Sequence, residues 1–69
     1  MEYGKVTVSK VRGDYVVRMG AGEGQSYEHK FFRRDYAYSD AKHLRGCFKR
    51  GMHPTVIVQN LGYVLVAGQ

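Results

Sequence analysis

Apolar and polar residues alternate along the first part of the chain, a pattern typical of strands buried on one face. Val6-Thr7-Val8 begins the first predicted strand, and Arg12-Gly13-Asp14 then predicts a tight turn, because glycine readily adopts a positive φ. Two further strands are predicted by residues that share one face, Tyr15, Val17 and Met19 in one strand and Tyr27, His29 and Phe31 in the other. The three segments predict an antiparallel meander.

The pattern changes after Asp35, where apolar residues recur at helical spacing. The residues on this apolar side are Ala41, Leu44, Cys47 and Phe48. Ser39 is a favourable N-cap, Lys49-Arg50 suits the negative end of the helix dipole, and Gly51 is a typical stop. The sequence therefore predicts a helix over residues 40–50.

Two runs rich in β-branched residues follow Pro54, at residues 55–58 and 63–66. Asn60-Leu61-Gly62 lies between them and predicts a hairpin turn. We therefore expect a single domain over residues 1–69 with an α+β fold. Its antiparallel sheet has about five strands and one helix, in the order β-β-β-α-β-β.

One helix cannot cover both faces of such a sheet. The apolar residues that cannot all face the helix are Val16, Phe32, Ile57, Val64 and Val66. Either the sheet curls into a partial barrel or its second face packs on a partner, since exposed apolar patches mark interfaces. A homodimer is therefore possible.

The positive charge of the chain is concentrated in one segment. Residues 29–53 contain seven lysines and arginines against two aspartates, which accounts for the whole net charge of +5. Clustered positive charge attracts acidic partners such as nucleic acid, a membrane surface or an acidic protein. The alternative is a solvated face that serves only solubility.

Cations and tyrosines of this segment are the candidate partner-binding residues, since tyrosine and arginine are enriched at interface hot spots. They are Lys30, Arg33, Arg34, Tyr36, Tyr38, Lys42, Arg45, Lys49 and Arg50. On the predicted helix, Gly46 lies in the middle of the basic arc, although glycine costs about 1 kcal/mol in a helix interior. Either a partner backbone approaches closely at Gly46, or packing tolerates the glycine.

Two classes of acidic partner fit these residues. Aromatic residues interleaved with cations over residues 30–38 are typical of single-stranded nucleic-acid binding, although some of these rings are needed for the core. The glycines of the RNA-recognition motif are missing, and a single predicted helix excludes a helix-turn-helix. We expect an acidic protein surface as the partner, with nucleic acid as the alternative.

Catalytic, cofactor and metal sites are not predicted. The glycine-rich stretch 20–25 lacks the Lys-Ser/Thr of a phosphate-binding loop, so a hairpin tip is expected there. His43 and Cys47 are one helical turn apart, with His53 beyond, but the paired spacing of a zinc site is missing. No carboxylate is placed to orient a nucleophile. We therefore expect a non-catalytic binding protein.

Cysteine content and hydropathy favour a cytoplasmic location. The single cysteine, Cys47, excludes an internal disulfide framework. No apolar run reaches the roughly 20 residues that span a bilayer, and Met1-Glu2-Tyr3 does not begin a signal peptide.

In size and layout, with strands around a helix at Ser39–Gly51, the chain resembles small phage-encoded inhibitor proteins such as the anti-CRISPR proteins. The resemblance rests on architecture and carries over no functional residue. It implies a protein that docks onto a host machine, in the host cytoplasm, and blocks its substrate or a conformational step. The positive charge departs from the acidic, nucleic-acid-mimicking members of that group.

Overall fold

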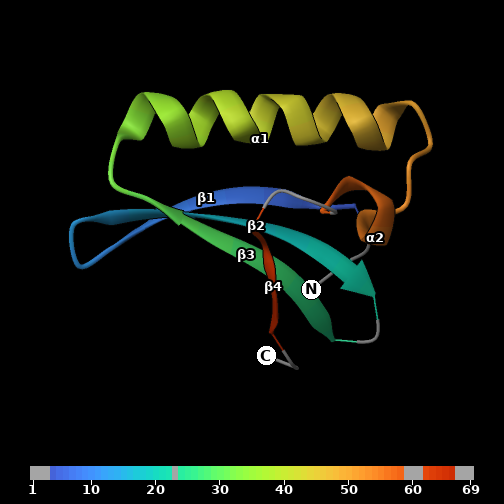
Figure 1. Cartoon of the computed structure of the whole chain (residues 1–69), viewed down its shortest axis with the longest axis horizontal. Helices are drawn as coiled ribbons and strands as arrows, with labels where there is room; N and C mark the ends of the chain where they lie inside the picture. The colour runs from blue at the N-terminus through green and yellow to red at the C-terminus, as the bar shows by residue number, and fades with distance from the viewer. Residues whose placement is uncertain (1–3, 23, 59–61, 67–69) are drawn as a thin grey trace.

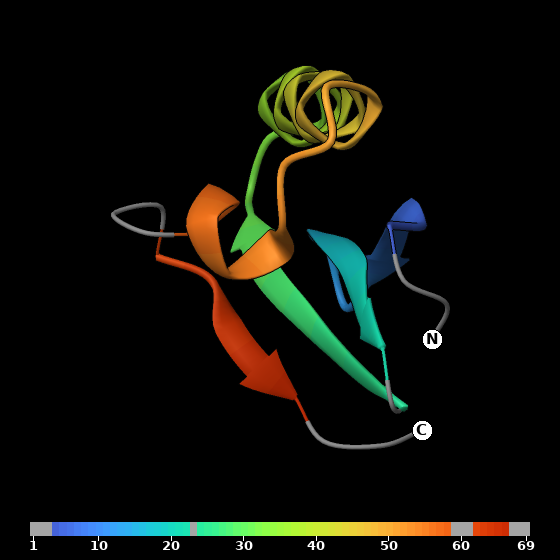
Figure 2. The ribbon, with the colours of Figure 1, turned by 90° about the vertical axis from the view of Figure 1, so that its right-hand side faces the viewer.

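The computed structural model describes residues 4–22, 24–58 and 62–66, which form a helix layer over a sheet layer (Figure 1). Four antiparallel strands make the sheet in the order β1-β2-β3-β4, with the bounds β1 (Val6–Val11), β2 (Asp14–Gly22), β3 (Gln25–Phe31) and β4 (Val64–Val66). The long helix α1 (Arg34–Lys49) covers one face of the sheet, and the short helix α2 (Pro54–Ile57) packs near one end of the same face (Figure 2). The predicted α+β class with one antiparallel sheet is confirmed.

The turn between β1 and β2 is confirmed at Arg12 and Gly13. Val11 pairs with Asp14, so only two residues connect the strands, and both have positive φ, 51° for Arg12 and 87° for Gly13. Two consecutive positive φ values define a type I′ turn, whose twist matches that of a hairpin.

In the glycine-rich stretch the strands extend further than expected, because β2 runs to Gly22 and β3 begins at Gln25.

A small apolar core lies between α1, α2 and the sheet. Its buried members are Val6, Val17, Met19, Ala37, Ala41, Leu44, Cys47 and Ile57. Val17, Met19 and Leu44 have no exposed surface, so the predicted inner faces of the second strand and of the helix are confirmed. Phe48 packs against the core from its edge.

Helix α1 begins at Arg34, six residues before the predicted start, so the Ser39 N-cap is wrong. Ser39 lies exposed in the second turn, and the actual N-cap, Arg33, makes no side-chain capping bond. Ala37 is fully buried and extends the apolar stripe one turn ahead of Ala41. Packing of Ala37 on the sheet, rather than a capping side chain, therefore stabilises the first turn.

The C-terminal end of α1 agrees with the prediction. Gly51 has a φ of +83° and donates its N–H to the carbonyl of Phe48, and Met52 donates to the carbonyl of Cys47. These two bonds form a Schellman motif, which satisfies the last carbonyls of the helix and requires the left-handed conformation at Gly51.

The strand predicted at residues 55–58 is wrong, because Pro54–Ile57 forms helix α2 and the described sheet has four strands rather than five. Pro54 occupies the first helical turn, and the His53 ring accepts a hydrogen bond from the Thr55 N–H at 3.2 Å. Proline at a helix start and an N-cap acceptor stabilise a helical turn. Packing of Ile57 into the core completes it, so capping and burial override β propensity.

The last predicted strand is confirmed in part. Val64–Val66 forms β4, as the β-branched run 63–66 predicts. The predicted hairpin with residues 55–58 is wrong, because β4 pairs with β3. Asn60 and Leu61, which belong to the predicted hairpin turn, lie outside the described residues.

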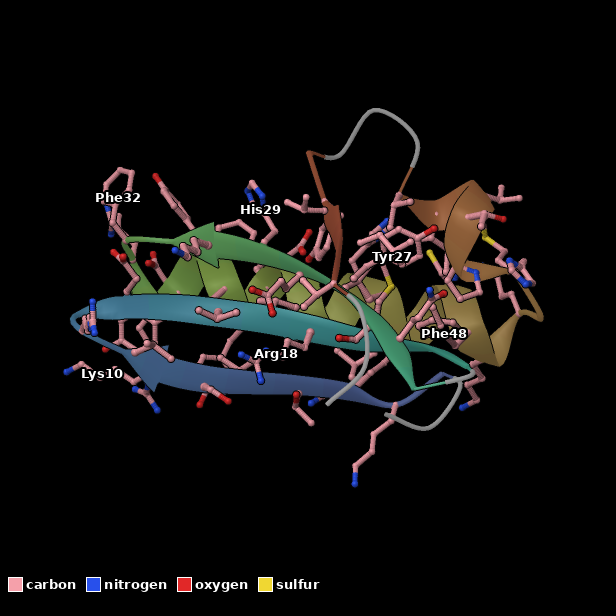
Figure 3. All side chains as sticks on the ribbon, turned by 90° about the horizontal axis from the view of Figure 1, so that it is seen from below. Lys10, Arg18, Tyr27, His29, Phe32 and Phe48 are labelled. Carbon is pink, nitrogen blue, oxygen red and sulfur yellow. The ribbon has the colours of Figure 1, made fainter. Side chains whose placement is uncertain are left out.

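The sheet face opposite α1, the open face, is polar at its centre (Figure 3). Arg18 donates from Nε to Oε2 of Glu28 at 2.9 Å, across neighbouring strands. Of the apolar residues expected to need cover there, Ile57 is in the core and Phe32 lies outside the sheet. Val16 is only 2% exposed, and Val64 is exposed on β4. The open sheet does not curl into a barrel, and the homodimer stays a prediction.

None of the helices formed by the described residues is long and apolar enough to cross a membrane.

Candidate protein-docking surface

One flank of α1 carries four cations and a tyrosine. We call this the basic flank, and its residues are Arg34, Tyr38, Lys42, Arg45 and Lys49. At 3.6 residues per turn, their spacing of three or four residues places all five within about 80° of the helix circumference. All five are exposed, so the predicted helix builds one continuous basic stripe along its length.

The contact of Arg45 places the basic flank on the β1 side of the sheet. β1 and β4 are the two opposite edges of the sheet beneath α1 (Figure 2). Arg45 donates from Nη2 to the carbonyl oxygen of Val6 at 3.3 Å, and Val6 begins β1. The flank and the outer edge of β1 therefore form one surface.

The aspartates of α1 do not neutralise the basic flank. Asp35 accepts two hydrogen bonds from the guanidinium of Arg33, at 3.2 and 3.1 Å, and Asp40 accepts one from the Tyr63 hydroxyl. Within residues 4–22, 24–58 and 62–66, no ion pair joins a cation of the basic flank to a carboxylate. Like charges held close together on one helix raise the local positive potential, so this flank attracts anions.

Aromatic rings next to the cations are held by cation–π contacts. The guanidinium of Arg33 lies 4.8 Å from the centre of the Tyr36 ring, and that of Arg34 lies 5.1 Å from the centre of the Tyr38 ring. Both tyrosines are about half exposed, and Phe32 just before the helix is 80% exposed. These rings offer apolar contact area beside the charges, a combination found at interface hot spots.

The predicted site residues do not all lie together. Lys30 alternates with His29 and Phe31 along β3, so it is on the open face, away from the cations of α1. Arg33 and Tyr36 lie at the start of the helix, outside the basic flank, and Arg50 is the C-cap residue. The structure thus gathers five of the nine predicted residues into one flank.

Gly46 lies on the outer side of α1, beside the basic flank. A methyl group built at this position meets only the end of the Arg50 side chain, at 3.5 Å, which is an ordinary contact. Packing within the described chain therefore does not require glycine here. The helix loses about 1 kcal/mol relative to alanine, which favours a reason outside the fold, such as the close approach of a partner.

The His43 and Cys47 pair is a packing contact at the flank of the core. The His43 Nε2 lies 3.7 Å from the Cys47 sulfur, and Arg50 donates to the same sulfur at 3.5 Å. Cys47 is only 3% exposed, so it behaves as a small buried apolar residue. Among the described residues, no three His, Cys, Asp or Glu side chains are grouped so that they could hold a metal ion.

A second cluster, which the sequence did not predict, fastens β4 to α1. Tyr63 donates its hydroxyl hydrogen to Asp40, and His29 Nδ1 donates to the carbonyl of Gly62 at 3.1 Å. Burial, the bond to Asp40 and the charge of that carboxylate together raise the pKa of Tyr63 well above its ordinary value. The cluster holds the chain after α2 against the helix, away from the basic flank.

Arg34, Asp35 and Tyr38 line an open hollow of about 460 Å³ at the start of α1, next to the basic flank.

Comparison with protein-family models, with curated proteins and with solved structures finds no match to this chain. We therefore argue the function from the charge and geometry of the docking surface.

Proposed function

We propose that this protein is a non-catalytic binding protein that docks the basic flank of α1 onto an acidic surface of another protein. The observation that carries the proposal is the uncompensated charge of the flank, four cations on one side of a 16-residue helix without a carboxylate partner among the described residues. Tyr38 adds apolar contact area within the flank, and Phe32 and Tyr36 add it at the start of the helix.

The aromatic residues support a protein partner over nucleic acid. Binding to single strands uses ring faces on which bases stack. In this protein a guanidinium lies over the rings of Tyr36 and Tyr38, which occupies one face of each.

We further propose that the protein acts as a small inhibitor, as its resemblance to phage-encoded inhibitors implies. A helix that covers an acidic site on a host machine blocks that site without chemistry of its own. Such a function requires affinity and shape rather than a catalytic group.

Charge reversal tests the proposal. The variant Lys42→Glu/Lys49→Glu removes two cations of the basic flank and keeps the Arg45 contact with β1. Its matched control is Lys5→Glu/Lys30→Glu, which changes net charge equally at exposed lysines outside the flank. Labelled poly-L-glutamate serves as the acidic polypeptide, and binding is followed by fluorescence anisotropy at 150 mM salt.

We expect the flank variant to lose at least tenfold in affinity and the control to lose less than threefold. The difference arises because screening limits each cation to nearby charges, within about 8 Å at this salt concentration. Equal losses in the two variants would show that only net charge matters and would overturn the proposed surface.

A further inference from the structure

β1 is an edge strand, and half of its backbone groups point outward. Gly20 of β2 donates its N–H to the carbonyl of Lys5 at 2.9 Å. Antiparallel pairs alternate between hydrogen-bonded and non-hydrogen-bonded, so every second residue after Lys5 faces β2. Val6, Val8 and Lys10 therefore direct their N–H and C=O groups away from the sheet, toward the side on which no strand lies among the described residues.

The contact from Arg45 supports this orientation independently. Its guanidinium donates to the Val6 carbonyl, which agrees with a carbonyl that β2 does not use. Within the described part of the chain, the outward N–H and C=O groups of Val8 and Lys10 make no hydrogen bond. Unpaired edges of this kind are templates for the addition of a strand.

We propose that the ledge formed by the outer edge of β1 and the basic flank of α1 binds an extended acidic segment of the partner protein, which pairs with β1 as a fifth strand. This inference rests on the proposed function and specifies the conformation and place of the partner segment. The outward groups of Val8 and Lys10 bond to its backbone. Arg45 exchanges its carbonyl contact for a carboxylate of the segment.

The positive charge around the outer edge of β1 favours an acidic segment as its occupant. β1 contains Lys10 and no acidic residue, and the flank above it contributes Arg45 and Lys49. A strand added here alternates its side chains between the helix side and the open face. Carboxylates at every second position then meet the cations of the flank. A second copy of this chain fits poorly, because pairing β1 with itself brings Lys10 and Arg45 of both copies together.

Amide NMR tests the inference on the unmodified protein. The probe is an acetylated, amidated hexapeptide of alternating glutamate and valine, equal in length to the six residues of β1. Its control is the same peptide with alternate amides N-methylated, which keeps the charge and blocks strand pairing. We expect the probe to slow amide exchange at Val8 and Lys10 and to leave Thr7 and Ser9, which already face β2, unchanged. The control peptide should bind at least tenfold more weakly.

The variant Val8→Pro gives a second test, because proline removes the outward N–H and is tolerated on edge strands. The substitution also changes a side chain that packs against the core, so the amide spectrum of α1 checks that the variant is folded. We expect about tenfold weaker binding of the probe by the folded variant. Equal binding of both peptides, or exchange unchanged at Val8 and Lys10, overturns strand addition. If the Lys42→Glu/Lys49→Glu variant still binds poly-L-glutamate more weakly than the wild type, the proposed function survives the failure of strand addition. If that variant binds as the wild type does, the proposed function fails on its own.

Discussion

Replacing Gly46 with alanine should stabilise the protein, although it alters a residue beside the basic flank. Alanine is favoured over glycine in a helix interior by about 1 kcal/mol, because glycine loses more backbone freedom on folding. The new methyl group meets only the flexible end of Arg50, at 3.5 Å, so no packing cost offsets the gain. For a domain of this size, about 1 kcal/mol raises Tm by about 4–8 °C.

Gly51→Ala is the matched control, because it makes the same chemical change five residues further along. Gly51 has a φ of +83°, and nothing in the described chain lies within 4 Å of a methyl group there. A left-handed conformation costs an L-residue about 1–2 kcal/mol, so this variant should be less stable than wild type. Thermal unfolding followed by circular dichroism measures both changes.

A lower Tm for Gly46→Ala would refute the reasoning, since it would mean that α1 is not a regular helix at this residue. The poly-L-glutamate assay adds a second result. If a partner backbone approaches at Gly46, the stabilised variant binds more weakly than wild type. Unchanged affinity would assign the glycine no part in docking.

Three further changes follow from the same contacts. Leu44→Ala removes a fully buried side chain and should lower the free energy of unfolding by about 2–5 kcal/mol, which is enough to populate the unfolded state of a small domain. Urea unfolding measures this change, and a loss below about 1 kcal/mol would contradict the core described above. Arg12→Asn should raise Tm by a few degrees, because asparagine adopts the left-handed conformation of the type I′ turn more easily than arginine; a lower Tm would contradict that turn. The free energy of unfolding should fall as pH rises above about 10, because folding raises the pKa of Tyr63 and the unfolded chain therefore loses the phenol proton first. Tyr63→Phe removes the bond to Asp40, so it should be less stable at neutral pH and should lose this alkaline dependence. An unchanged pH profile in that variant would contradict the assignment.

The elements that the sequence predicted well depend on local chemistry. The turn at Arg12 and Gly13 needs a residue that accepts positive φ, and the end of α1 needs Gly51. The inner face of α1 was visible in the spacing of Ala41, Leu44 and Cys47. Each of these signals is contained within one or two helical turns or one hairpin.

The errors arose where packing between distant residues decides the structure. α1 starts at Arg34 because Ala37 packs on the sheet, and no capping residue marks that start. β-branched residues of Pro54–Ile57 form a helix because Ile57 reaches the core. The bond from Tyr63 to Asp40 spans 23 residues and leaves no local trace in the sequence.

For the candidate site, helical periodicity was enough to gather the cations of α1 on one flank. Lys30 belongs to the other sheet face, which follows from its alternation with His29 and Phe31 along the strand. The position of the flank above β1 was not predictable, because it depends on how α1 lies across the sheet and on the contact from Arg45 to Val6.

The central claim, that the basic flank binds an acidic protein rather than nucleic acid, is tested most directly by a salt series. Binding of poly-L-glutamate and of labelled single- and double-stranded oligonucleotides is measured from 50 to about 300 mM salt, with the Lys42→Glu/Lys49→Glu variant alongside. Nucleic-acid binding through four phosphates, one for each cation of the basic flank, falls about 10²-fold over a fourfold rise in salt. We predict that at 150 mM salt the wild-type protein binds the polypeptide more tightly than either oligonucleotide. We also predict that the Lys42→Glu/Lys49→Glu variant binds the polypeptide much more weakly than the wild type does. Tighter binding of an oligonucleotide at that salt concentration would contradict the proposal and assign the flank to nucleic acid.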